Sequence, residues 1–319
     1  MTTSSPSPLS ASVRSLLAWE PSAVAMRRSA WLAVVANIGL AFSGAIVRVT
    51  SSGLGCPEWP RCTGDSLVPV HNAQHPALNM AIEFGNRLLG IAVFLAILAC
   101  LVVAVRMRPR RRSLVVLAAL LPAGWILQAV IGGLSVWYAL SPGWVTAHFL
   151  GSVVMITLAV TLHVRSQEGD APPVRATPRW PSRIASVLVA DVACVLVAGT
   201  VVTGSGPHAG DASSPRYPFR LDQVAHVHAA FVYVLVALTA ALLVLLYRRR
   251  DADRVLWTRA LQLGAVIVAQ AVIGYVQYFT GVPAALVVLH VLGACVLWAA
   301  VLRVRFATRT RAAVADAAG

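Results

Sequence analysis

Residues 128–154, QAVIGGLSVWYALSPGWVTAHFLGSVV, recur 142 positions later at 270–296 as QAVIGYVQYFTGVPAALVVLHVLGACV. The two copies align without a gap, so Gln128 matches Gln270 and His148 matches His290. Each copy holds two apolar stretches around a short turn, which predicts a pair of helices. A duplicated helix pair with one histidine at the same position in each copy indicates two related sites in one chain.

The composition is that of a membrane protein. The 319 residues are 58% hydrophobic and 12% charged, with a mean hydropathy of +0.75, whereas a soluble domain carries about 25% charged residues. The apolar runs are longer than barrel strands, which need only about ten alternating residues. We therefore expect an all-α fold of eight transmembrane helices, near 29–50, 77–105, 114–138, 144–164, 184–204, 223–247, 257–279 and 284–304.

The basic residues indicate the orientation of these helices. All 26 are arginines, and the net charge is +14. With a cytoplasmic N-terminus, 21 of the 26 fall on the cytoplasmic side of the predicted helices, as the positive-inside rule requires. We expect a multi-pass protein of the plasma membrane with both termini cytoplasmic. Because the arginines serve topology, we expect no nucleic-acid binding.

A polar segment divides the chain in two. Residues 165–183, RSQEGDAPPVRATPRWPSR, predict a cytoplasmic linker between four-helix halves at 29–164 and 184–305. Each half has an even number of helices, so the repeat is parallel and equivalent residues share a depth. VTSSG at 49–53 and VTGSG at 202–206 extend the likeness to the first helix of each half. Segments 1–28 and 306–319 are expected to be a disordered N-terminus without a cleavable signal peptide, and a cytoplasmic tail.

The same register compares the polar residues of the halves. It places Asn86 opposite His228, so the first half offers Glu83, Asn86 and His148 where the second offers His228 and His290. Two histidines on facing helices of a four-helix unit can ligate one haem iron from both sides. The alternative for each histidine is a hydrogen-bonded place in the core.

Two further choices concern helix faces. His226 competes with His228 as a ligand; residues two apart lie on different faces of a helix, and the repeat register selects His228. Glu83, Asn86 and Arg87 share one face because they are spaced i, i+3 and i+4. A carboxylate inside a membrane helix predicts a functional site. An interfacial Glu83–Arg87 ion pair is the alternative, and the two readings are compatible because an arginine can hold the carboxylate ionised.

The outer loops hold other candidates. Cys56 and Cys62 lie in GCPEWPRC, on the oxidising side of the membrane, which favours a disulfide. His208, in GSGPHAGD, is a candidate for contact with a haem propionate, and His71 and His75 are interpreted as loop residues. The chain has no CxxCH attachment motif, so any haem would be non-covalent.

Five stretches together resemble the haem A synthase family. They are GAIVRVTSSGLGCPEWPRC (44–62), IEFGNRLLG (82–90), TAHFLG (146–151), GTVVTGSGPHAGD (199–211) and VLHVLG (288–293). The resemblance implies two pseudo-symmetric four-helix bundles with haem sites toward the outer face. It implies an enzyme that oxidises the C8 methyl of haem O to the formyl of haem A, by successive hydroxylations with water as the oxygen source, for terminal cytochrome oxidase.

The resemblance also implies roles for residues and partners. A haem b is held by His228 and His290, the substrate haem is ligated by His148, and Glu83 is catalytic, with Asn86 and Arg87 as further candidates. The Cys56/Cys62 pair is linked to a redox role. Candidate partners are haem O synthase (protohaem farnesyltransferase), cytochrome oxidase assembly factors and a second copy of the chain.

One position departs from the family pattern. Many members carry E-x-x-H-R in the second helix, whereas this chain reads Glu83-Phe84-Gly85-Asn86-Arg87. Asparagine is not a useful iron ligand, so we expect the first half to hold its haem from one side through His148. Loss of catalytic competence in that half is the alternative.

Two other classes of protein compete with this interpretation. A di-haem b-type membrane electron-transfer protein explains His228 and His290 but predicts a second histidine pair, and Asn86 counts against it. A transporter built on parallel repeats predicts polar residues at the midplane, whereas the polar residues here gather near the outer face.

Overall fold

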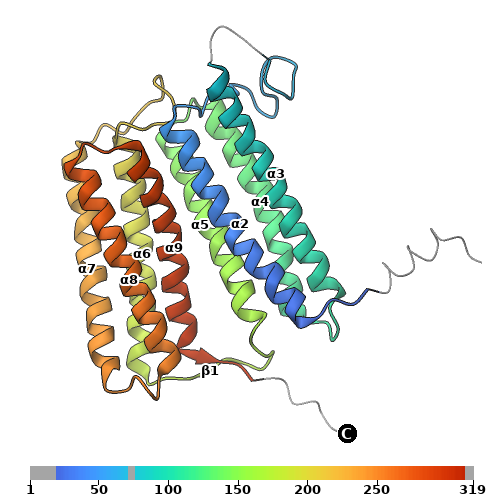
Figure 1. The fold of residues 1–319 in the computed structure, drawn as a ribbon, viewed down its shortest axis with the longest axis vertical. Coiled ribbons are helices and arrows are strands. Elements are labelled where there is room, and N and C mark those ends of the chain that lie inside the picture. Colours follow the sequence, from blue (N-terminus) through green and yellow to red (C-terminus); the bar gives the residue numbers. More distant parts are fainter. Residues whose placement is uncertain (1–18, 71–75, 313–319) are drawn as a thin grey trace, which may run out of the picture.

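The computed structural model describes residues 19–70 and 76–312, and eight helices within them are long and apolar enough to cross a membrane (Figure 1). They are α2 (Ala23–Val49), α3 (Ala77–Arg106), α4 (Arg112–Trp137), α5 (Pro142–Arg165), α6 (Arg179–Ser205), α7 (Leu221–Tyr247), α8 (Arg254–Phe279) and α9 (Ala284–Ala307). With 24–30 residues each, they exceed the roughly 30 Å hydrocarbon core at 1.5 Å per residue. The chain is an all-α, multi-pass membrane protein.

Two helices begin earlier than the hydropathy pattern predicted. α2 begins at Ala23 and not at 29, because the Ser22 side chain accepts a hydrogen bond from the Ala25 amide and caps the helix. α6 begins at Arg179, inside the predicted linker, after Pro178 at its N-cap. His71 and His75 lie outside the described residues, as do residues 1–18 and 313–319 of the predicted disordered N-terminus and tail. The described part of these two segments is structured in places, since α2 covers residues 23–28 and the end of α9 and β2 lie beyond residue 305.

The described helices form two bundles with the same internal order, side by side in Figure 1. In the first, α2 and α4 each contact α3 and α5; in the second, α6 and α8 each contact α7 and α9. The contacts between bundles follow the same correspondence, since α2 packs on α9 as α6 packs on α5. The bundles are therefore related by a pseudo-twofold axis that runs along the helices.

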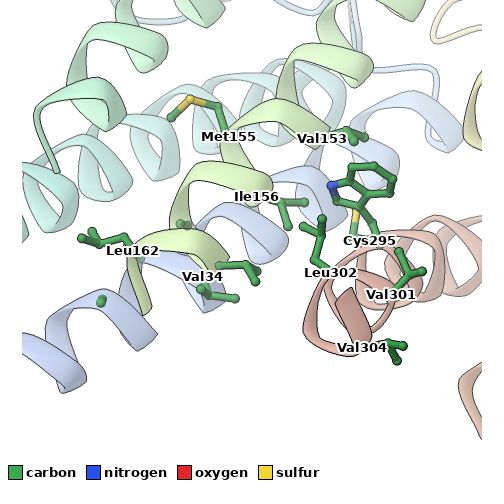
Figure 2. Close-up of a cluster of buried hydrophobic side chains, with 14 of the residues drawn as sticks. Val34, Val153, Met155, Ile156, Leu162, Cys295, Val301, Leu302 and Val304 are labelled. Atoms are coloured by element: carbon green, nitrogen blue, oxygen red, sulfur yellow. The ribbon is translucent and has the colours of Figure 1, made fainter. Parts of the chain in front are cut away.

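An apolar seam joins the two bundles (Figure 2). Val34 of α2, Ile156 of α5 and Leu302 of α9 are 3%, 0% and 7% exposed in this seam. Trp298 Nε1 of α9 donates a hydrogen bond of 2.8 Å to Thr157 Oγ1 of α5. The seam therefore combines close apolar packing with a polar link between the halves.

Loops tie the bundles together at both ends. At the end that carries the termini, β1 (Val174–Arg175) pairs antiparallel with β2 (Arg309–Thr310). At the opposite end, the Arg48 side chain donates to the carbonyl oxygens of His208 and Thr203. Arg48 thus links the first bundle to α6 and the loop after it, and the β1–β2 pair links the segment between the bundles to the end of α9.

Candidate functional site

The second bundle brings two predicted histidines together. His228 of α7 and His290 of α9 face each other with ring centroids 6.4 Å apart and planes inclined by 70°. A metal–imidazole bond is about 2.0–2.1 Å and the ring centre lies about 1.2 Å beyond the nitrogen, so two rings on opposite sides of one metal have centres about 6.4 Å apart. The pair is therefore spaced to hold one metal between its rings.

A backbone contact orients His228. Its Nδ1 lies 3.0 Å from the Val195 carbonyl oxygen, which can only accept, so Nδ1 carries the proton and donates. The Nε2 lone pair is then free for a metal, in the arrangement usual for histidine ligands. The Nδ1 atom of His290 is buried without a hydrogen-bond partner among the described residues, so this ring has no backbone acceptor of the kind that orients His228.

The repeated glutamine and glycines support the histidine of each copy. Gln128 Nε2 donates to the His148 carbonyl at 2.9 Å, and Gln270 Nε2 donates to that of His290 at 3.1 Å. Gly132 lies against the His148 imidazole, where an added Cβ would be 3.2 Å from Cε1. The corresponding contact of Gly274 with His290 is 3.3 Å.

A second glycine in each copy gives the glutamine its space. A Cβ on Gly151 of α5 would overlap the Gln128 side chain, and a Cβ on Gly293 of α9 would overlap that of Gln270. The invariant positions of the repeat are therefore one structural device used twice: it anchors the histidine backbone and leaves room for its ring.

The donor set of the second bundle suits iron in a porphyrin better than a bare ion. Among the described residues, no group of three His, Cys, Asp or Glu side chains could hold a metal ion. Two imidazoles suffice for haem iron, whose other four ligands are porphyrin nitrogens. The half-buried, correctly spaced histidine pair thus fits a bis-histidine haem.

The first bundle holds a different set. Asn86 of α3 stands where α7 has His228, and its Oδ1 lies 2.7 Å from Ser43 Oγ of α2. Both line a cavity of about 150 Å³ between α2 and α3. His148 of α5 is the counterpart of His290, so the described residues place one histidine, and not two, at the matching level of this bundle.

Glu83 is joined to the loop between α2 and α3 through Arg87. Glu83 is 7% exposed and its Oε1 accepts from Arg87 Nε at 3.1 Å. The other guanidinium nitrogens of Arg87 donate to backbone carbonyls of the loop, at Cys56, Glu58 and Arg61, over 2.8–3.2 Å. The predicted ion pair therefore exists, and it also fastens the loop to the bundle.

The loop is closed by the predicted disulfide and capped by tryptophans. Cys56 and Cys62 are bonded, and both are fully buried. The Trp59 ring lies against Gly133 of α4, where a Cβ would overlap it, and the Trp59 carbonyl accepts from Trp137 Nε1 at 3.2 Å. The disulfide was predictable from the sequence, but the capping role of Trp59 was missed, because a tryptophan between two prolines in a loop gives no signal of its packing partner.

Two further candidates lie away from the histidine pair. His226 is exposed, and its Nδ1 lies 2.7 Å from the carbonyl of Asp222 in its own helix. His208 is half-buried, and its Nε2 lies 2.9 Å from the Val282 carbonyl in the α8–α9 turn. Neither ring takes part in the contact between His228 and His290.

Parts of this chain are similar in sequence to two haem A synthases and, over a shorter segment, to a protohaem IX farnesyltransferase. A haem A synthase of Lysinibacillus sphaericus is 33% identical over 136 residues, which cover 41% of this chain and 42% of that protein. A haem A synthase of Shewanella oneidensis is 28% identical over 140 residues, 39% of this chain and 40% of that protein. A protohaem IX farnesyltransferase of Thermus thermophilus is 37% identical over 82 residues, 25% of this chain but 13% of that protein.

The alignments with the haem A synthases thus span about two fifths of each relative. The family comparison is broader. Residues 27–302, from the start of α2 to the last turns of α9, match the COX15-CtaA family, described as cytochrome oxidase assembly proteins. This match includes both bundles and the histidine, glutamate and cysteine positions described above, and the chain therefore belongs to the COX15-CtaA family of cytochrome oxidase assembly proteins.

Proposed function

We propose that this protein is a haem A synthase, an oxidoreductase that converts the C8 methyl of haem O to the formyl of haem A by successive hydroxylations with water as the oxygen source. The observation that carries the proposal is the chemical difference between the two bundles. One has a facing histidine pair, His228 and His290, while the other has Glu83, Asn86 and His148. Membership of the family and the two haem A synthase relatives support the same reaction.

The second bundle is the cofactor half, in residues 184–305 of the predicted division. His228 and His290 would hold a non-covalent haem b, which supplies one-electron oxidation chemistry when bound. The protein's own contribution is to keep both rings fixed: His228 through the Val195 carbonyl and His290 through Gln270 and Gly274. Two fixed protein ligands favour a permanently bound group over an exchanging one. His208 lies in the α6–α7 connection of this half, against the α8–α9 turn, and is the candidate for a contact with a haem propionate.

The first bundle, in residues 29–164, is the substrate half. His148 would ligate the substrate haem from one side, and Asn86 leaves the other side without a protein ligand. A haem held from one side exchanges more readily than one held from both sides, as a substrate that must leave as product requires. The alternative is a first half that has lost catalytic competence. Substitution of Glu83 separates this alternative from a substrate site.

Glu83 is the group placed for proton transfer in the substrate half. Its carboxylate is 7% exposed and is oriented by Arg87, so it can accept a proton during hydroxylation or stabilise positive charge on the substrate. Arg87 and the disulfide loop close the outer side and limit access of bulk water. Because both cysteines are fully buried, we assign the electron exit to the second bundle and the disulfide to holding the loop.

The proposal includes a location and partners. The arginine-rich helix ends, which also carry the chain termini, would face the cytoplasm of a plasma membrane, and the histidines would lie toward the outer face. Haem O synthase and cytochrome oxidase assembly factors are the partners to test, alongside homo-oligomers. The 82-residue likeness to a protohaem IX farnesyltransferase is a reason to test the first.

Substitution of Glu83 tests the catalytic assignment. Glu83→Ala should abolish conversion of haem O to haem A, measured by mass analysis of extracted haems, while the haem b content of the purified protein stays at one per chain. Asp191→Ala is the matched control, because Asp191 is a second carboxylate buried in a membrane helix, at 8% exposed, outside the proposed site. Unchanged turnover in Glu83→Ala would remove Glu83 from the mechanism.

The haem content of cells tests the function as a whole. Cells that make haem O should accumulate haem A only when they also carry this chain. If they contain haem O and haem b but no haem A in its presence, the di-haem electron-transfer alternative gains and the proposed function fails.

A further inference from the structure

The two bundles differ at two neighbouring positions: His228 and Gly199 in the second bundle correspond to Asn86 and Ile46 in the first. In the second bundle, Gly199 of α6 faces the His228 ring, and a Cβ on Gly199 would lie 3.3 Å from Cε1 and 3.6 Å from Nδ1. The imidazole therefore occupies space that this glycine leaves free. Any larger side chain at 199 would have to fill the same space.

In the first bundle the residue that corresponds to Gly199 is larger, and the residue that corresponds to His228 is smaller. The alignment of VTSSG (49–53) with VTGSG (202–206) places Ile46 at the position of Gly199, as Asn86 is at the position of His228. Ile46 and Asn86 line the same cavity of about 150 Å³. A glycine and an imidazole in one half are thus replaced by an isoleucine and an amide in the other. An imidazole at 86 would compete with the Ile46 side chain for space.

Hydrogen bonding assigns a direction to the Asn86 amide. Ser43 Oγ lies 2.9 Å from the Leu40 carbonyl oxygen and 2.7 Å from Asn86 Oδ1. A hydroxyl has one proton and cannot donate to two acceptors, whereas the two ends of an asparagine amide are assigned from their partners. With the amide turned, Asn86 Nδ2 donates to Ser43, Ser43 donates to Leu40, and the amide oxygen is left as an acceptor beside the cavity.

We propose that the cavity lined by Ser43, Ile46 and Asn86 is a water-binding site of the first bundle, at the position where the second bundle has the His228 ring. Ile46 would keep a second protein ligand away from a haem held by His148, the Asn86 amide oxygen accepts a hydrogen bond from the bound water, and Ser43 is a positioning residue that fixes the amide. The site would hold the water that serves as oxygen source, so this inference rests on the proposed function and deepens it.

The first test uses electron paramagnetic resonance of the full-length protein saturated with protohaem. The wild type should show a low-spin signal from the second half and a high-spin signal that broadens in water enriched in oxygen-17. N86H alone should keep most of the high-spin signal, because Ile46 obstructs the ring. The double variant N86H/I46G should convert it to low spin and lose the broadening. An unbroadened wild-type signal, or complete conversion by N86H alone, would overturn the inference.

The second test does not depend on a new buried histidine. Added imidazole should bind the first-half haem of Ile46→Gly at least tenfold more tightly than that of the wild type. Ile126→Gly is the matched control, because Ile126 is 56% exposed on α4 and away from the cavity, and its imidazole affinity should equal that of the wild type. Equal affinities in the wild type and Ile46→Gly would overturn the inference.

The same preparations separate this inference from the proposed function. Wild type that forms no haem A from haem O, but shows the broadened signal, would sink the proposed function and leave the water site standing. Wild type that forms haem A but shows an unbroadened signal would support the proposed function and overturn the water site. A first half that takes up no haem would overturn the water site, and haem A formation would then report on the function by itself.

Discussion

Arg87 donates to one carboxylate and to three backbone carbonyls, which a single planar guanidinium can reach because its donors spread over a fixed fork. The sequence placed Arg87 beside Glu83 by helix spacing alone. The sequence could not show that Arg87 also binds three backbone carbonyls, because every residue has a backbone carbonyl and the sequence does not mark which ones are used. At this residue the loop, the disulfide and the helix that carries Glu83 become one unit.

Arg87→Lys should loosen that unit although the charge is kept. A lysine ammonium cannot reach all four partners, and each lost hydrogen bond to a charged group costs about 1.5–3 kcal/mol. We expect a lower melting temperature in detergent and faster protease cleavage within the loop at 51–70. Arg61→Lys is the control, since its partner Asp65 is 96% exposed and such surface pairs contribute about 0–1 kcal/mol. Equal cleavage rates in the two variants would contradict the role given to Arg87.

At the scale of elements, the glutamine–glycine contacts set the distance between the paired helices. α4 packs on α5, and α8 on α9, with a glutamine of one helix placed over a glycine of the other. The sequence revealed both residues as matched positions of the repeat. It did not reveal that they touch, because a repeat reports equivalence between copies and not contact within a copy.

Gly293→Ala should therefore destabilise the second bundle. Its methyl would overlap Gln270, and overpacking of this kind costs about 1–3 kcal/mol. Gly39→Ala is the control, because Gly39 is a helical glycine with nothing within 4 Å of an added Cβ, and alanine there should be neutral or stabilising. Thermal unfolding of both variants in the same detergent makes the comparison, and a Gly293→Ala variant as stable as Gly39→Ala would contradict the packing argument.

At the scale of the whole molecule, the two bundles are held together by the α2–α5–α9 seam and by polar links at both ends. The bond from Trp298 to Thr157 crosses the seam. Thr157 also donates to its own helix, at the Val153 carbonyl, so loss of the tryptophan N–H leaves the hydroxyl satisfied. This makes the pair suitable for measuring the coupling between the halves.

A double-mutant cycle of Trp298→Phe with Thr157→Val should give a coupling of about 1 kcal/mol, the usual net value of such a hydrogen bond. A second cycle of Trp125→Phe with Thr157→Val is the control, because Trp125 packs on Phe94 within the first bundle. Its coupling should be near zero. Equal couplings in both cycles would show that the bond does not link the bundles energetically.

The ion pair between Arg111 and Asp170, at the arginine-rich end of the helices, should respond to acid. A hydrogen bond from Arg111 lowers the pKa of the Asp170 carboxyl below its ordinary value, which is about 3.9 in an unfolded chain. A lowered folded pKa stabilises the protein fully above the unfolded value, and the contribution is lost as the pH falls through the folded value. Asp170→Asn should thus lower the melting temperature at pH 7, and the gap should shrink below about pH 4. A gap that stays constant down to pH 3 would contradict this origin.

Hydropathy and the arginine pattern predicted the helices well, because a membrane span must be long, apolar and internally hydrogen-bonded wherever it packs. The errors lie at two helix starts, Ala23 and Arg179, where capping by Ser22 and a proline at the N-cap extend a helix beyond its apolar run. The Cys56–Cys62 disulfide was also predictable, since the two cysteines share one short loop.

The sequence by itself therefore determined the all-α class, the repeat and the residues in equivalent positions, because these depend on local composition and periodicity. Only the tertiary structure decided which of these residues meet. The ring of His228 points at His290 while His226 is exposed, Arg87 gathers loop carbonyls, and Ile46 stands beside Asn86 where Gly199 stands beside His228. Each of these facts is a distance between helices or loops far apart in the chain, and such distances arise only when the helices pack.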